Sequence, residues 1–173
     1  MSGAATATDR PSMVRFWVIV AIVVAIDFTT KWLVVRNLAH HVPVRVVGEY
    51  ARLFLTYNPG AAFGMHVGDA SRWVFGALST IITIALVRWY LQTPPSAPLV
   101  RVALPIVVGG ALGNLIDRIR LREGVVDFID IGIGSTRFWV FNVADAAVTV
   151  GAILLILAMW RQDDGTASQT ATA

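Results

Sequence analysis

Two aspartates, Asp127 and Asp145, stand out because the chain around them is so apolar. They lie in the segments Val-Val-Asp-Phe-Ile-Asp and Phe-Asn-Val-Ala-Asp of a 173-residue sequence that is 56% hydrophobic. An aspartate inside a bilayer costs about 2.5 to 3.5 kcal/mol on insertion scales, which makes each one a candidate functional group. Two neighbouring carboxylates cannot both ionise easily, so one keeps a proton near neutral pH while the other acts as a base. Such a pair could draw a proton from water and protonate the carbonyl oxygen of a peptide bond.

Other interpretations of these residues remain open at this point. Asn142 followed three residues later by Asp145 is also the pattern of a helix N-cap, in which the two side chains bond free amides of the first turn. Asp27 and Lys31 are spaced as an i, i+4 ion pair, and Asp127 could be an exposed loop acid. A further hypothesis is ion or proton translocation, in which Asp27, Asp127 and Asp145 form a relay. The chemistry of these residues alone supports peptide hydrolysis and translocation equally.

The composition disfavours several other chemistries. The sequence has no cysteine, which removes disulfides, thiolate nucleophiles and cysteine-ligated metals. The histidines, His40, His41 and His66, lack the spacing of a metal-binding helix motif, so we expect no metal site. The single lysine, Lys31, has no serine within one helical turn, which disfavours a Ser–Lys dyad. Because the 13 arginines are scattered at segment ends and in loops, we expect no nucleic-acid surface.

The overall composition predicts an integral membrane protein. Only 14% of the residues are charged and the mean hydropathy is +0.67, whereas a soluble domain has a charged fraction of about 25%. A helix of about 20 residues crosses a bilayer core about 30 Å thick. Four segments qualify, at about 16–35, 73–91, 99–116 and 140–160, with tryptophans at or near their ends as an aromatic belt requires. We expect one integral membrane domain over residues 1–173, with disordered tails at 1–12 and 162–173.

These spans bring the unusual polar residues to one membrane face. The proline-rich segment 92–98 predicts a short turn that makes the second and third spans antiparallel. In an up-and-down bundle, the following residues then emerge on the same side: Asp27, Lys31, Asn58, Asn114, Asp117, Arg118, Asn142 and Asp145. A translocation relay would need polar groups strung through the depth of the bilayer. The sorting to one end therefore favours a single polar site near one face.

Two connecting segments on that face predict strands. Residues 37–70 and 124–141 are rich in β-branched and aromatic residues and partly alternate in polarity. We expect a small β-layer against the bilayer, over the polar site, with Asp127 on the layer or at its edge. Asp130 is interpreted as a solvated loop acid, and Asp117 as a local partner for loop backbone or an arginine.

Small residues in two spans predict close helix packing. Gly109 and Gly113 are four positions apart in the third span, and Ala147 and Gly151 have the same spacing in the fourth. Such pairs let helix backbones approach closely in a membrane. Close approach is also what two facing aspartates require.

Five sequence blocks resemble those of a known family. They are Asp27-Phe28-Thr29-Thr30-Lys31, Asn58-Pro59-Gly60-Ala61-Ala62-Phe63-Gly64, Gly109-Gly110-Ala111-Leu112-Gly113-Asn114-Leu115-Ile116-Asp117-Arg118, Val125-Val126-Asp127-Phe128 and Phe141-Asn142-Val143-Ala144-Asp145. In order and spacing they resemble the bacterial lipoprotein signal peptidase family, signal peptidase II, over about residues 15–160. Any one block is weakly specific, whereas five in series are strongly specific.

The resemblance implies an intramembrane aspartyl endopeptidase of the bacterial inner membrane. It implies an all-α polytopic fold of four transmembrane helices, with both termini cytoplasmic and a small extracytoplasmic β-cradle. The implied substrates are lipid-modified prolipoproteins, cleaved just before a cysteine that already carries diacylglycerol. The implied partners are these substrates and membrane lipid, with no cofactor, metal or nucleic acid.

Carried over position by position, the resemblance places the catalytic pair on Asp127 and Asp145. The supporting residues fall on Asp27, Asn58, Asn114, Arg118, Asn142 and Ala144. As hypotheses, Arg118 and Asn114 hold the substrate backbone or lipid-linked polar groups. Asn142 orients Asp145, and Asn58 steadies the loop that covers the cleft.

The distribution of arginines conflicts with the implied orientation. The cytoplasmic side would hold Arg10, Arg15, Arg88, Arg101 and Arg161, and the outer side Arg36, Arg45, Arg52, Arg72, Arg118, Arg120, Arg122 and Arg137. The positive-inside rule favours the reverse orientation. We follow the family topology, because some outer arginines are expected to serve the site or lipid headgroups and because Arg10 and Arg15 precede the first span.

Overall fold

The computed structural model describes residues 10–60 and 70–170, and within these ranges it contains four long helices. They are α1 (Arg10–Asn37), α2 (Ser71–Gln92), α3 (Pro98–Arg120) and α4 (Val143–Thr170). Each contains a segment long and apolar enough to cross a membrane, so the four predicted spans are confirmed. The proline-rich turn is confirmed as well, because α2 ends at Gln92 and α3 begins at Pro98. Proline suits the first turn of a helix, where its missing amide has no bond to lose.

The two outermost helices extend beyond the predicted spans. α1 begins at Arg10 and α4 continues to Thr170, so both helices extend into the predicted tails, over residues 10–12 and 162–170, and disorder of the tails stays a prediction. Once a helix has formed, each further residue adds a backbone hydrogen bond, and polar residues can therefore prolong an apolar helix. The rest of the predicted tails, 1–9 and 171–173, lies outside the described residues.

The helix α3 lies at the centre of the bundle. It packs against α1, α2 and α4, and its Leu104 and Val108 form a core with Phe16 of α1 and Tyr90 of α2. The other three helices expose many large apolar side chains, as expected of surfaces that lie in lipid. All six tryptophans are at least 41% exposed, which agrees with the predicted aromatic belts.

Glycines of α3 and α4 allow the close packing that the sequence predicts. Gly109 lies against Val23 of α1, and a Cβ placed on it would be 2.7 Å from the Val23 Cβ. Gly151 of α4 packs in the same way against Val107 of α3. Gly113 lies where α1, α3 and α4 meet, and an added Cβ would be 2.6 Å from Oδ2 of Asp27. The backbones therefore approach within distances that only glycine permits.

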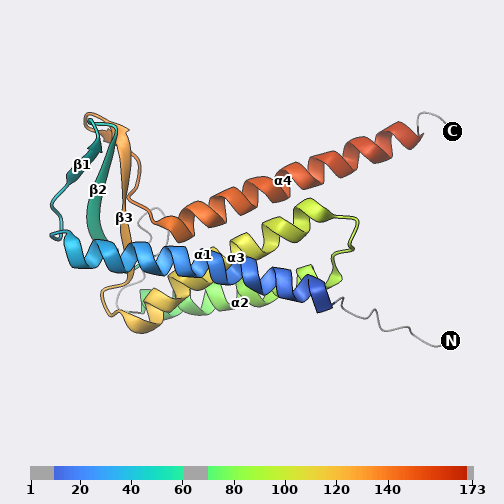
Figure 1. The fold of residues 1–173 in the computed structure, drawn as a ribbon, viewed down its shortest axis with the longest axis horizontal. Coiled ribbons are helices and arrows are strands. Elements are labelled where there is room, and N and C mark those ends of the chain that lie inside the picture. The colour runs from blue at the N-terminus through green and yellow to red at the C-terminus, as the bar shows by residue number, and fades with distance from the viewer. Residues whose placement is uncertain (1–9, 61–69, 171–173) are drawn as a thin grey trace.

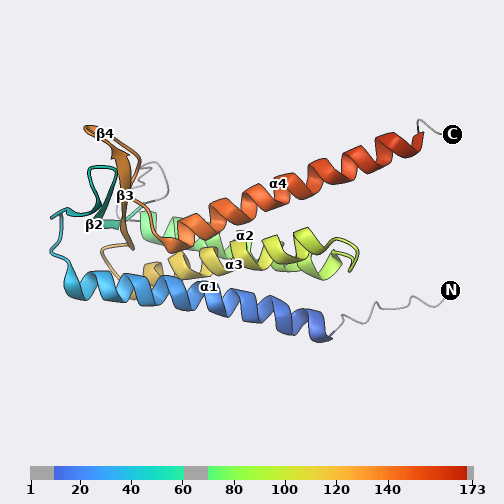
Figure 2. The same ribbon diagram turned by 45° about the horizontal axis from the view of Figure 1, so that its top comes forward.

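One end of the bundle is covered by a four-stranded antiparallel sheet (Figure 1). Its strands are β1 (Val44–Val47), β2 (Ala51–Asn58), β3 (Val125–Ile133) and β4 (Thr136–Arg137), in that spatial order. The predicted β-layer is thus confirmed from both connecting segments. The start of α1 and the end of α4 lie at the opposite end of the bundle, and α4 diverges from the other helices along its length (Figures 1 and 2).

The inner strand β3 fixes the direction of Asp127. Val126 and Phe128 are buried in a small core with Val34 of α1 and Leu55 of β2. Since successive side chains of a strand point to opposite faces, Asp127 points away from that core. Asp127 pairs with Thr56 of β2, next to an irregularity in the register of the two strands. Such irregularities change the direction of neighbouring side chains and are frequent beside active sites.

Candidate active site

The N-terminus of α4 is closed by a reciprocal pair of hydrogen bonds. The Asp145 amide donates to Asn142 Oδ1 at 2.9 Å, and the Asn142 amide donates to Asp145 Oδ2 at 3.1 Å. This is a capping box, so the local interpretation of this pair is confirmed. The Asp145 carboxylate also lies in the first turn of the helix, where the helix dipole favours negative charge.

The same Asn142 side chain reaches the second aspartate. Its Nδ2 donates to Asp127 Oδ1 at 2.7 Å, and it is also within hydrogen-bond distance of the Val126 carbonyl at 3.3 Å and Asn114 Oδ1 at 3.0 Å. Asn142 is fully buried. It therefore joins Asp127 on the sheet to Asp145 on α4 through a single residue. The Asn142 side chain therefore both caps α4 and connects the two carboxylates.

Two further asparagines bond the remaining carboxylate oxygens. Asn114 of α3 donates from Nδ2 to Asp145 Oδ1 at 2.7 Å. Asn58, the last residue of β2, donates from Nδ2 to Asp127 Oδ2 at 3.1 Å. The other end of the Asn58 amide accepts a hydrogen bond from the Gly60 backbone amide at 3.1 Å. Each oxygen of both carboxylates thus accepts at least one hydrogen bond, and Asn58 ties Asp127 to the start of the next loop.

Asp127 and Asp145 differ in their surroundings. Asp127 is 2% exposed, and burial together with the negative charge of Asp145 raises its pKa to about 7, against the lowering effect of its bonds from Asn58 and Asn142. Asp145 is less deeply buried and has the helix N-terminus beside it. The environment therefore favours a proton on Asp127, and this difference in surroundings is the asymmetry that acid–base chemistry needs.

A buried lysine forms ion pairs with two further acids, Asp27 and Asp117. Lys31 is 4% exposed, and its Nζ lies 2.7 Å from Asp27 Oδ2, 2.9 Å from Asp117 Oδ2 and 3.0 Å from Asn114 Oδ1. The predicted Asp27–Lys31 ion pair is confirmed. The sequence did not indicate that Lys31 also reaches α3 and, through Asn114, the catalytic candidates. The sequence signal that could have pointed to Lys31 is that it is the only lysine in the chain.

A hydrogen bond to Asp27 connects α1 to the start of α4. Its Oδ1 accepts a hydrogen bond from the Ala144 amide at 2.8 Å, and both residues are buried. Ala144 is also close to Gly113, where an added Cβ would be 3.2 Å from the Ala144 Cβ. A small side chain at Ala144 therefore permits the contact of α1, α3 and α4 that positions Asp145.

Arg118 links α3 to the loop that follows β2. Its Nη1 donates to the Asn114 carbonyl at 3.2 Å and its Nη2 to the Gly60 carbonyl at 3.0 Å. Its Nε is buried and has no partner among the described residues. Asn114, in contrast, uses its side chain on Lys31, Asn142 and Asp145. Of the two residues predicted to hold substrate, Arg118 retains a free donor, whereas Asn114 acts on its protein neighbours.

The structure agrees with the prediction for Asp117 and contradicts the one for Asp130. Asp117 accepts a hydrogen bond from the Val126 amide at 3.2 Å, as expected for a partner of loop backbone, although its cation is Lys31 and not an arginine. The prediction that Asp130 is solvated is wrong. Asp130 is 3% exposed and forms ion pairs with Arg52 and Arg137 at 2.5 and 2.8 Å. The strand pairing brings both arginines to it, which the local sequence does not indicate.

The predicted site residues gather at the sheet end of the bundle and do not form a relay through the depth of the bilayer. Asp27 bonds Lys31 and Ala144 and connects to Asp127 only through other side chains. Within the described ranges, no three His, Asp or Glu side chains are grouped in a way that could hold a metal ion.

The fold is that of a bacterial membrane enzyme. A solved bacterial membrane enzyme, determined by the in meso method at 2.3 Å resolution, matches with a TM-score of 0.79 at 33% identity, over 87% of this chain and 90% of that one. A second such structure, at 1.9 Å resolution, gives a TM-score of 0.74 at 34% identity, over 84% and 92% of the two chains.

Sequence comparisons identify the family. The family model described as signal peptidase (SPase) II matches residues 19–161. The lipoprotein signal peptidase of Syntrophotalea carbinolica is 42% identical over 83% of this chain and 89% of its own length. That of Geobacillus kaustophilus is 40% identical over 86% and 94%. The chain belongs to the signal peptidase II family and is a peptidase, as the five blocks predicted, and membership in this family decides against the translocation hypothesis.

Proposed function

We propose that this peptidase removes the signal peptide from lipid-modified prolipoproteins by an aspartyl mechanism. The catalytic residues are Asp127 and Asp145, and they hold one proton between them. The single observation that carries the proposal is the Asn142 side chain, which bonds Asp127 at 2.7 Å while Asn142 caps the helix that bears Asp145. Family membership supports the substrate class, because the relatives are lipoprotein signal peptidases.

The proposed reaction uses the asymmetry between the two carboxyl groups. Asp145 accepts a proton from water, and the water oxygen forms a bond to the scissile carbonyl carbon. Asp127 donates its proton to the carbonyl oxygen, which gives a neutral tetrahedral diol. When the carbon–nitrogen bond breaks, Asp145 passes its proton to the leaving nitrogen and a hydroxyl proton of the diol returns to Asp127. No covalent enzyme intermediate forms, and the pair ends in its starting state.

The supporting residues divide into two groups in this mechanism. Asn142, Asn114 and Asp27 position the carboxylates, since their side chains bond each other, the pair or the start of α4. Arg118 and Asn58 contact Gly60, the last described residue after β2, and we assign both to substrate contact or to holding this end of β2. The loop that Asn58 was predicted to steady falls on residues 61–69, which lie outside the described residues. Arg118 retains its buried Nε donor for the carbonyl of an extended substrate. Ala144 leaves room for this packing because its side chain is a single methyl group.

The proposed substrate enters from the membrane. A signal peptide is an apolar helix, which must unwind locally before water can reach its backbone. A site beneath a sheet at one end of the bundle can hold the unwound segment while the diacylglyceryl chains of the modified cysteine stay in lipid. We place the enzyme in the bacterial inner membrane with the sheet on the extracytoplasmic side. A reporter active only in the cytoplasm, fused to the 92–98 turn, should then give signal, and a silent fusion would reverse this orientation.

The test of the mechanism is an in vitro cleavage assay on matched substrates. A diacylglyceryl-modified prolipoprotein should be cleaved just before its modified cysteine, whereas the unmodified precursor should resist. Asp127→Asn and Asp145→Asn should each reduce kcat by at least about a thousandfold while the protein still inserts. Asp130→Asn is the matched control on the same strand, because among the described residues the Asp130 carboxylate bonds Arg52 and Arg137 and neither Asp127 nor Asp145 nor their asparagine partners. Full activity in either variant of the pair would overturn the assignment.

A further inference from the structure

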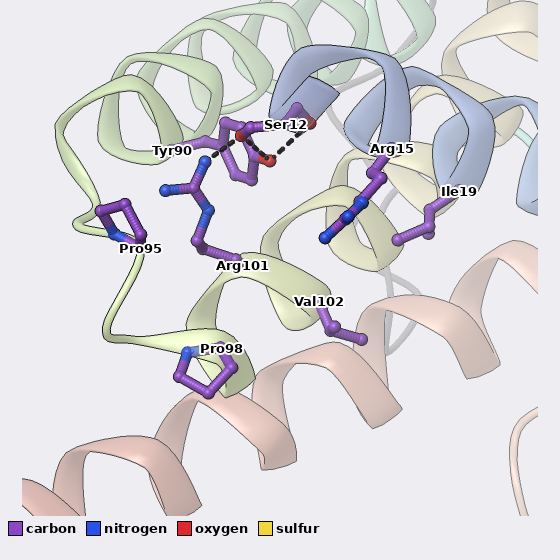
Figure 3. A pocket seen from close by; sticks show the side chains of 8 residues that line it. All are labelled: Ser12, Arg15, Ile19, Tyr90, Pro95, Pro98, Arg101 and Val102. Atoms are coloured by element: carbon purple, nitrogen blue, oxygen red, sulfur yellow. Dashed lines mark hydrogen bonds between the residues drawn. The ribbon is translucent and has the colours of Figure 1, made fainter. Parts of the chain in front are cut away.

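The bundle end opposite the sheet contains a cavity that the carboxylate site does not use. It has a volume of about 260 Å³ and lies between the first turns of α1, the end of α2 and the start of α3 (Figure 3). Its polar lining is Ser12, Arg15, Tyr90 and Arg101, and its apolar lining includes Ile19 and Val102. This space is much larger than a single water molecule requires.

One of the two arginines is held in place by its neighbours. Arg101 donates from Nη1 to the Thr93 carbonyl at 3.0 Å and from Nη2 to Ser12 Oγ, and its guanidinium lies 5.1 Å from the centre of the Tyr90 ring. Tyr90 in turn donates from its hydroxyl to the Ser12 carbonyl at 2.8 Å. A guanidinium has five N–H donors, so three remain for a ligand. The arginine is thus already ordered for binding.

The second arginine, Arg15, has no partner among the described residues. Arg15 makes no hydrogen bond or ion pair with the rest of the described chain, and Figure 3 shows its side chain directed from α1 toward α3. The acidic side chains that the structure describes belong to the sheet end, where Lys31, Arg52 and Arg137 pair with them. Two guanidinium groups therefore share a cavity without a described carboxylate. Planar guanidinium donors are well matched to phosphate oxygens.

The surroundings of the cavity favour a lipid over a soluble anion. Ile19 and Val102 form an apolar wall, and Trp17, Val18 and Trp89 close to it in sequence are 49%, 51% and 41% exposed. Exposed apolar and tryptophan side chains near the end of a span mark the level of the headgroups. A phospholipid at this level would place its phosphate beside the two arginines and its acyl chains against the apolar wall. The two positive charges favour an anionic headgroup over one that brings its own cation.

We propose that this cavity binds the phosphate group of an anionic phospholipid, with Arg15 and Arg101 as its charged partners. The bound lipid joins α1, α2 and α3 at the end of the bundle remote from the reaction. The site does not depend on the proposed cleavage mechanism. Asp127→Asn should therefore bind the lipid as tightly as the wild type does.

The test is lipid binding to the purified full-length protein in neutral detergent, followed by native mass spectrometry. Phosphatidylglycerol is compared with phosphatidylcholine of the same acyl chains and with glycerol phosphate as a soluble anion. Arg15→Gln should weaken phosphatidylglycerol binding by about fivefold, as expected for one basic residue near a headgroup. Arg101→Lys retains the positive charge but removes the guanidinium geometry, and it should also weaken phosphatidylglycerol binding. Arg88→Gln is the matched control, because Arg88 is an exposed arginine at the same end of α2 and does not line the cavity.

The expected result is a preference for phosphatidylglycerol that both cavity variants reduce and Arg88→Gln leaves unchanged. Equal binding of the two lipids by the wild type would overturn the proposal, and so would an equal loss in the Arg88 variant. Glycerol phosphate that binds as tightly as the lipid would assign the site to a soluble anion instead. Arg15→Gln keeps the test decisive even if changes at Arg101 unfold the helix junction.

Discussion

Asn142 donates a hydrogen bond to Asp127 across the junction between the sheet and α4, over a distance of 2.7 Å. The residue that begins a helix is thereby also the residue that fixes an acid on a strand. Because the cap and the connection use different atoms, Oδ1 for the first and Nδ2 for the second, substitution can separate them.

Asn142→Ser should separate capping from catalysis. Serine is as good an N-cap as asparagine, but it lacks the amide that reaches Asp127. The variant should keep its Tm within a few degrees and lose kcat by about a hundredfold or more. Asn142→Ala should lose the same activity and also about 1 kcal/mol of stability. Thermal unfolding in detergent and steady-state cleavage measure the two effects, and wild-type activity in the serine variant would show that the cap alone matters.

The rate should depend on pH through Asp127. Its pKa, raised to about 7 by burial and by Asp145, keeps the carboxyl protonated below that pH. As the pH rises through about 7 the proton is lost, and with it the acid that the proposed mechanism needs, so kcat should fall on the alkaline side. A series of kcat measurements between pH 5 and pH 9 checks this. A kcat that stays constant to pH 9 would assign the acid to another group.

Gly113→Ala should loosen the junction of α1, α3 and α4. The new Cβ would lie 2.6 Å from Asp27 Oδ2, too close to be accommodated without movement of the ion pair. Overpacking of this kind costs about 1 to 3 kcal/mol, and displacement of α4 should lower kcat as well. The control is Gly76→Ala on α2, where the nearest atom to an added Cβ is Leu115 Cδ1 at 3.9 Å. Alanine there should be neutral or stabilising, because glycine is the poorer helix former.

Asp130 should stabilise the sheet in a manner that depends on pH. Although burial opposes it, hydrogen bonds from Arg137 and Arg52 hold the pKa of Asp130 below its ordinary value of 3.8. A lowered folded-state pKa gives stability that is present above the unfolded value and is lost as the pH falls through the folded one. Asp130→Asn should therefore cost roughly 1 to 3 kcal/mol at neutral pH, and less below about pH 4.

The matched control for Asp130 is Glu49→Gln, which removes an ion pair with Arg45 whose side chains are 55% and 70% exposed. Exposed pairs contribute little, so this variant should unfold with the wild type at every pH. Thermal unfolding from pH 3 to pH 7 measures both. An equal effect of the two substitutions would mean that the buried network adds nothing to the stability of the sheet.

The sequence by itself determined the helices, the presence of the sheet and the residue types of the site. Apolar segments of about 20 residues predict spans wherever they occur. The capping box of Asn142 and Asp145 was equally accessible, because its atoms come from residues three positions apart. The Asp27–Lys31 pair is four positions apart and was found for the same reason. Local chemistry of this kind depends on spacing along the chain and needs no tertiary contact.

Only the tertiary structure decided what those residues contact. Ala144 and Asp27 are 117 positions apart, and Asn58 and Asp127 are 69 apart. Lys31 could be seen as half of an ion pair, but its bonds to Asp117 and Asn114 required α1 to pack against α3. Asp130 looked solvated because its two arginines arrive through strand pairing. Such contacts depend on how glycine-lined helices and paired strands pack, which the spacing of residues along the chain does not specify.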